Sequence, residues 1–136
     1  MKKILSNVNL PSRMRRQQGL YVIYSAEDFY EIIERERARA DRSNQCFSLV
    51  VFDVDLSDMD STKPEHVVSV LASRMRISDE IGWFDKRRIG MILPDTLEEG
   101  AWKLADEVCQ EINGKSPTSF CTVYAYPSEK WPVESG

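Results

Sequence analysis

The chain has 136 residues, and its 42% hydrophobic and 29% charged residues are the balance of one globular domain whose core needs neither disulfides nor metals. Its net charge of -4 is uneven, because residues 1–18 carry five of the 18 basic side chains and none of the 22 acidic ones. The strongly acidic remainder excludes a general nucleic-acid-binding surface. We interpret residues 1–20 as a solvated basic tail or lead-in; contact with a partner or a membrane surface is the alternative.

Cysteine and histidine content limits the cofactors and the compartment. The three cysteines are widely spaced and form no C-x-x-C pair, which predicts reduced, mostly buried thiols in a cytoplasmic protein. One histidine is too few for a His/Cys zinc site, and no apolar run approaches the roughly 20 residues of a membrane span. We therefore expect no cofactor, no bound metal and no membrane span. The cysteines are Cys46, Cys109 and Cys121.

The first regular element that the sequence predicts is a helix over Ser25–Arg42. Ser25 is a good N-cap residue, and Phe29 and Ile33 lie four positions apart on one apolar stripe. The second half of the helix, residues 34–42, is almost entirely charged. That half is expected to follow the surface or to project from it.

Strand and helix patterns then alternate. Phe47–Asp53 is an uninterrupted apolar run that predicts a central strand buried on both faces. A helix that begins at Pro64 is expected to run to Ser78, because proline suits the first helical position. Two short strands follow, Glu80–Phe84 and Ile89–Leu93, joined by a turn at residues 85–88.

The last two elements are a helix and a strand. Thr96 and Glu99 have the spacing of a capping box, and the helix that follows is expected to end at Ile112, before Asn-Gly. The last strand is predicted at Phe120–Tyr126. The expected core includes Leu49, Val51, Leu104 and Val108.

This order is a helix followed by β-α-β-β-α-β, the split βαβ or ferredoxin-like (palm) arrangement of the α/β (α+β) class. We expect a four-stranded antiparallel sheet with helices packed on one face and an extra N-terminal helix. Residues 21–127 form the single domain and residues 128–136 a C-terminal tail. The arrangement places Asp53 and Asp55 beside the hairpin turn.

Three stretches, in this order and spacing, resemble the GGDEF domains of diguanylate cyclases. Residues 34–42 followed by 47–55 are similar to that family's charged helix and LxxxDxD strand. Residues 76–84 are similar to its RxxD motif and the strand that leads into its signature turn, and residues 91–105 to its LLPxT strand and next helix. The resemblance covers residues 25–126. It implies the palm fold, a metal-dependent GTP site and an inhibitory cyclic di-GMP site.

The signature itself departs from the family. A gapless alignment from Arg76 to Pro94 lays Gly-Gly-Asp/Glu-Glu-Phe on residues 85–89, which are Asp-Lys-Arg-Arg-Ile. Both glycines, which let the turn approach the phosphates of a nucleotide, are absent. The metal-binding acid falls on Arg87 and the following glutamate on Arg88. The segment between Asp55 and Pro64 is also shorter than the family's guanine-binding segment.

These changes remove the expected chemistry. Two-metal phosphoryl transfer needs converging carboxylates, and arginines that face Asp53 favour an ion pair over bound Mg²⁺. We therefore expect no catalytic residue and a vestigial metal site at Asp53 and Asp55. Asp53 is expected to pair with at least one of the basic turn residues. The other members of this cluster, with Arg76 nearby, are expected to stay open to an acidic partner or a phosphate. The basic turn cluster is Lys86, Arg87 and Arg88.

Arg76 and Asp79 fall on the RxxD motif. The resemblance implies that this pair binds cyclic di-GMP, and a helix-end ion pair is the alternative. The sequence thus predicts a catalytically inactive GGDEF-like domain with a regulatory or protein-interaction role in bacterial signalling. A cyclic di-GMP sensor is the second hypothesis and an active nucleotidyl cyclase the third. The partner and the oligomeric state are left open.

Overall fold

The computed structural model describes residues 23–54, 64–112, 114, 120–128 and 131. The basic lead-in at residues 1–20, Asp55 and most of the tail at residues 128–136 lie outside the described residues. None of the described helices is both long enough and apolar enough to cross a bilayer. The elements in chain order are β1 (Ile23–Tyr24), α2 (Ala26–Ser43), β2 (Phe47–Asp53), α3 (Pro64–Ser73), β3 (Glu80–Trp83), β4 (Arg88–Pro94), α4 (Glu98–Ile112) and β5 (Cys121–Tyr126).

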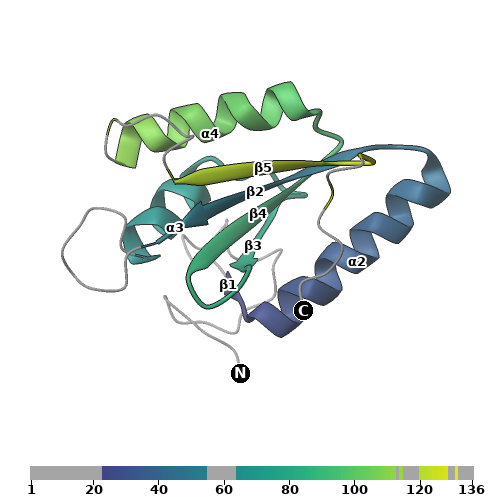
Figure 1. The fold of residues 1–136 in the computed structure, drawn as a ribbon, viewed down its shortest axis with the longest axis horizontal. Helices are drawn as coiled ribbons and strands as arrows, with labels where there is room; N and C mark the ends of the chain where they lie inside the picture. Colours follow the sequence, from purple (N-terminus) through teal and green to yellow (C-terminus); the bar gives the residue numbers. More distant parts are fainter. Residues whose placement is uncertain (1–22, 55–63, 113, 115–119, 129–130, 132–136) are drawn as a thin grey trace.

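The strands form one sheet in the order β1-β3-β4-β2-β5, with β2 second from one edge (Figure 1). The antiparallel β-α-β-β-α-β part confirms the predicted fold class and the interior position of β2. The predicted strand count was wrong, because β1 adds a fifth strand that pairs with β3 in parallel, Ile23 opposite Ile81. A strand of two residues is too short to leave an alternation in the sequence.

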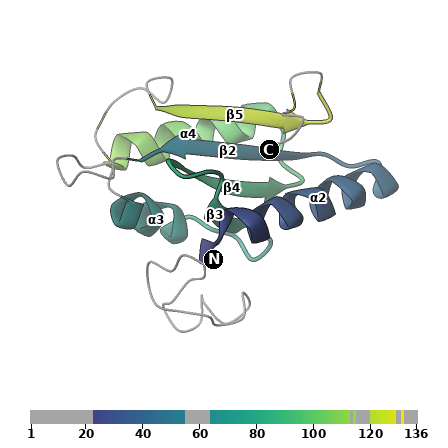
Figure 2. The ribbon, with the colours of Figure 1, turned by 60° about the horizontal axis from the view of Figure 1, so that its bottom comes forward.

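The sheet is covered on both faces. Helices α3 and α4 pack on one face, over a core that includes Val50, Phe52 and Met91. Helix α2 covers part of the opposite face, where Phe47, Leu49 and Val51 are fully or almost fully buried. Figure 2 shows α2 and α4 separated by the sheet. The expectation that the helices pack on one face therefore holds for α3 and α4 and was wrong for α2.

Helix α2 forms as predicted. The Ser25 hydroxyl accepts a hydrogen bond from the Asp28 backbone N–H at 3.1 Å, and Asn44 ends the helix in the left-handed conformation. The ring of Phe29 lies against Gly82 and Gly90, which are cross-strand partners on β3 and β4. Gly82 requires glycine, since a Cβ there would lie 2.8 Å from the Cβ of Phe29, and a Cβ on Gly90 would be in tight contact with the ring edge at 3.0 Å.

Two helix boundaries differ from the predictions. Helix α3 ends at Ser73 instead of Ser78, because the buried Asp79 carboxylate accepts a hydrogen bond from the Arg76 N–H at 2.8 Å and fixes a turn there. Helix α4 begins at Glu98, and the Thr96 hydroxyl donates to the Pro94 carbonyl instead of capping it.

The predicted core is largely correct. Val108 is fully buried, whereas Leu104 is only partly buried at the margin of the core under α4. The cysteines are free thiols, and burial raises the pKa of Cys109 to about 11 and also raises the pKa of Cys121. Both therefore remain protonated at neutral pH, and Cys46 is partly buried.

Candidate functional site

The β3–β4 turn is closed by the carboxylate of Asp85. Its Oδ1 accepts a hydrogen bond from the Arg87 backbone N–H at 2.9 Å. Its Oδ2 accepts from Nε and Nη2 of Arg88 at 2.9 and 2.6 Å. The first residue of the aligned signature therefore holds the turn with its side chain, where the family has glycine.

Electrostatics agree with this geometry. Partial burial by itself raises the pKa of Asp85, but hydrogen bonds from the Arg88 side chain and the Arg87 backbone bring the pKa below its ordinary value. The same hydrogen bond raises the pKa of Arg88. Asp85 is thus charged at neutral pH, and its contribution to stability is lost only as the pH falls through its lowered pKa.

Asp53 was expected to pair with an arginine of the turn, and this prediction was wrong. Asp53 is opposite Arg88 in the β2–β4 register, but the guanidinium of Arg88 bonds Asp85. The more distant Asp53 adds only the smallest of the contributions that raise the pKa of Arg88. Asp85 lies in the same turn as Arg88, so the Arg88–Asp85 ion pair costs less conformational entropy than a pair between Arg88 and Asp53 on the neighbouring strand.

Lys86 and Arg87 form the exposed tip of the hairpin. Neither has an ion-pair partner among the described carboxylates. Asp55 lies outside the described residues, so the expected pair with Asp53 is not tested. In the described part of the chain, no three His, Cys, Asp or Glu side chains are grouped as a metal ion would require.

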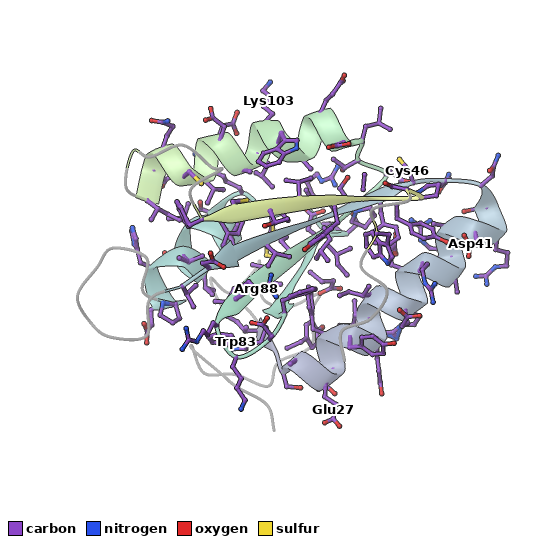
Figure 3. The ribbon with its side chains drawn as sticks, viewed as in Figure 1. Glu27, Asp41, Cys46, Trp83, Arg88 and Lys103 are labelled. Atoms are coloured by element: carbon purple, nitrogen blue, oxygen red, sulfur yellow. The ribbon has the colours of Figure 1, made fainter. Side chains whose placement is uncertain are left out.

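An aromatic row beside the hairpin was not anticipated as a unit. The Arg88 guanidinium lies 4.9 Å from the centroid of the Phe84 ring, and this ring stacks on Tyr124 at 6.4 Å. Trp131 contacts Tyr124 and packs edge-on against Phe47 at 5.0 Å. Figure 3 labels Arg88, which lies at the hairpin end of this row. The sequence feature that could have indicated this row is the pair Tyr124 and Tyr126, which are two residues apart and so lie on the same face of the last strand.

Arg76 and Asp79 form the ion pair that was the alternative hypothesis. Nη2 of Arg76 lies 3.0 Å from Oδ1 of Asp79, whose side chain is 2% exposed against 53% for Arg76. The same Nη2 donates to the Pro94 carbonyl at 3.1 Å and to the Thr96 hydroxyl at 3.0 Å. The hydrogen bond with Asp79 is the largest cause of the raised pKa of Arg76.

Arg76 does not lie near the basic turn, contrary to the prediction. Arg76 contacts Pro94, which is the last residue of β4. The basic turn lies at the other end of this strand, just before its first residue, Arg88. A seven-residue strand separates its ends by roughly 20 Å. The two basic features of the sequence are therefore separate sites.

A third feature is an open pocket of about 360 Å³ near the α2–β2 connection, where Figure 3 labels Cys46. None of the candidate site residues named from the sequence lines this pocket. Its lining is Asn44, Gln45, Cys46, Asp95 and Pro127.

Comparison with known proteins identifies the fold. No protein-family model and no curated protein matches the chain, whereas solved structures do. A DGC protein from Thermotoga maritima superposes with a TM-score of 0.65 at 14% identity, over 80% of this chain and 85% of that one. The GGDEF domain of DgcB from Caulobacter crescentus, in complex with c-di-GMP, gives 0.58 at 16% identity, over 90% and 78%.

The active GGEEF domain of a diguanylate cyclase from Vibrio cholerae gives a TM-score of 0.54 at 17% identity, over 73% of this chain and 71% of that domain. At these identities the likeness establishes the fold. The chain has the fold of GGDEF domains, which confirms the resemblance drawn from its sequence.

Proposed function

We propose that this chain is a catalytically inactive GGDEF-like domain of the cytoplasm, with a regulatory or protein-interaction role in bacterial signalling. The observation that carries the proposal is the charge of the β3–β4 turn. Arg87 and Arg88 stand where the aligned signature has its two acids, and Asp85 already neutralises Arg88.

The chemistry of the turn supports inactivity. In diguanylate cyclase chemistry a 3′ hydroxyl attacks the α-phosphorus of a nucleoside triphosphate and pyrophosphate leaves, and Mg²⁺ must be held by carboxylates from both the strand and the turn. Asp53 remains at the strand end, but the residue opposite it is Arg88. A guanidinium at that position supplies no oxygen ligand for a divalent cation.

The exposed hairpin tip supports an interaction role. Lys86 and Arg87 are presented on a turn whose backbone is fixed by Asp85, and the rest of the body is acidic. Two cations that have no ion-pair partner among the described carboxylates, on a turn closed by Asp85, suit an acidic protein surface. The charged half of α2, residues 34–42, is the other candidate surface. There Arg37 and Arg39 already pair with Glu34 and Glu36.

An activity assay tests the first part of the proposal. The purified chain is expected to make no cyclic di-GMP from GTP with Mg²⁺ or Mn²⁺, and GTP with Mg²⁺ should give no binding heat in a calorimetric titration. The Vibrio cholerae domain named above is the positive control. Cyclic di-GMP above the no-enzyme level that is lost in Asp53→Ala would show that the site is catalytically active.

A cyclic di-GMP sensor is the second candidate function. The observation that favours it is a guanidinium at Arg76 that is half exposed and fixed by the buried Asp79. If the site binds the dinucleotide, titration with cyclic di-GMP gives a saturating heat that Arg76→Ala removes. Arg74→Ala is the matched control, because Arg74 lies in the same connection between α3 and β3 and pairs with Glu107 and Glu111 on α4. No heat with the wild-type chain would exclude this candidate.

A further inference from the structure

The two edges of the sheet differ in length and in pairing. At one edge lies β1, which has two residues. At the other lies β5, which has six and pairs with β2 alone among the described strands (Figures 1 and 2). A short edge offers little to another chain, whereas a long one presents a row of backbone donors and acceptors. The edge of β5 is therefore the one to examine for association.

The register determines which groups of β5 face outward. The Asp53 N–H donates to the Phe120 carbonyl at 2.9 Å, and Phe52 is opposite Cys121, so Asp53 and Phe120 form a hydrogen-bonded pair. Such pairs alternate along antiparallel strands. Thr122, Tyr124 and Tyr126 consequently bond β2.

The backbone polar groups of the intervening residues of β5 point away from β2. The N–H and C=O groups of Cys121, Val123 and Ala125 are directed to the open side of the strand. The other side of β2 is consistent with this alternation, because the next residue, Val54, donates to Arg87 beside β4 at 3.0 Å. Three donors and three acceptors thus lie in line along the edge.

Sequence devices that usually protect an edge are absent from β5. Its residues, Cys-Thr-Val-Tyr-Ala-Tyr, include no charge, no proline and no glycine. Val123 packs on the core under α4, and Tyr124 and Tyr126 contact Trp131 on the opposite face. Because side chains on both faces of β5 are packed, the strand is already extended before it pairs. Pairing with another strand therefore costs little additional conformational entropy.

We propose that β5 pairs with β5 of a second copy of this chain, antiparallel and centred on Val123. In this register Val123 bonds Val123 of the other copy, and Cys121 bonds Ala125. All outward donors and acceptors of both strands are then used, which no shifted register achieves. The two five-stranded sheets become one continuous sheet with a two-fold axis at Val123.

Charge restricts where a second copy can approach, and β5 is a place where it can. The chain carries a net charge of -4, so two copies repel over most of their surface, and β5 is an uncharged stretch of six residues. Six residues of strand bury less surface than a permanent interface needs. The dimer is accordingly an equilibrium that depends on concentration.

Sedimentation equilibrium combined with residue-resolved hydrogen exchange tests the proposal. The mass should rise towards that of a dimer up to millimolar concentration. Over the same range the amides of Cys121, Val123 and Ala125 should slow by about tenfold when about nine-tenths of the chains are paired, because only the unpaired fraction exchanges. The inward amides of Thr122 and Tyr124 are the internal control and should not respond.

Val123→Pro removes an outward N–H but no bond to β2, and it should leave the chain monomeric. Val123→Thr keeps that N–H and the side-chain shape, and it should still dimerise. A chain that stays monomeric at every concentration overturns the proposal. So does a dimer whose three outward amides exchange unchanged or that persists in a folded Val123→Pro variant. If that variant fails to fold, the exchange pattern of the wild-type chain decides.

Discussion

Replacing Phe29 by alanine is expected to lower the free energy of unfolding by about 3–5 kcal/mol, the range for a large buried aromatic side chain. The ring is 1% exposed and lies in the groove that Gly82 and Gly90 leave on β3 and β4. Few other side chains attach α2 to the sheet, because only Ile33 and Ala40 are also buried on this helix. Its loss therefore opens a cavity and loosens the whole helix.

Urea denaturation measures this change, and Tyr30→Ala is the matched control. Tyr30 is the next residue of the same helix and is 43% exposed, so its truncation should change stability by less than about 1 kcal/mol. Equal denaturation midpoints for the two variants would show that Phe29 does not attach α2 to the sheet.

Gly82→Ala is expected to destabilise the chain by about 1–3 kcal/mol through overpacking. The added methyl group would lie 2.8 Å from the Cβ of Phe29, an atom that cannot move unless the helix backbone moves. In a Phe29→Ala background the contacts with the ring atoms Cδ1 and Cγ, at 2.4 and 2.5 Å, are gone and only the one with Cβ remains, so the same substitution should cost less. A double-mutant cycle followed by thermal unfolding measures this coupling.

Gly100→Ala serves as the control for that cycle. Gly100 is an exposed residue of α4, and a methyl group there meets only the Thr96 side chain, at 3.2 Å. Alanine is the better helix former, so this variant should be neutral or stabilised by up to about 1 kcal/mol. Fully additive effects of Gly82→Ala and Phe29→Ala would contradict the packing described here.

The long regular elements were predictable because their patterns are local. Phe47–Asp53 is continuously apolar and lies inside the sheet, and Ser25 caps α2 as its position before an apolar stripe indicated. The face that α2 covers was not predictable, since it depends on a match between Phe29 and two glycines in strands far along the chain. A stripe identifies a buried face but not the surface that buries it.

The candidate site was predicted in its residues but not in its contacts. The reversed charge at Arg87 and Arg88 is plain in the sequence, whereas the choice of Asp85 over Asp53 depends on the geometry of one tight turn. Arg76 was misplaced because α3 was taken to continue past Ser73 towards the hairpin. The turn that the Asp79 carboxylate stabilises directs Arg76 to the far end of β4 instead.

The pairing of β2 also determines the order in which the sheet is assembled. β3 and β4 are neighbours in sequence, and their hairpin closes over a short turn. β2 can pair with β4 as soon as that hairpin has formed. The other side of β2 pairs with β5, which comes much later in the chain, and there Phe47 lies opposite Tyr126. Loop-closure entropy makes this distant contact slow. We therefore expect β2, a wholly apolar run up to Asp53, to be paired on one side only until residues 121–126 are available, and to be exposed to aggregation during that time.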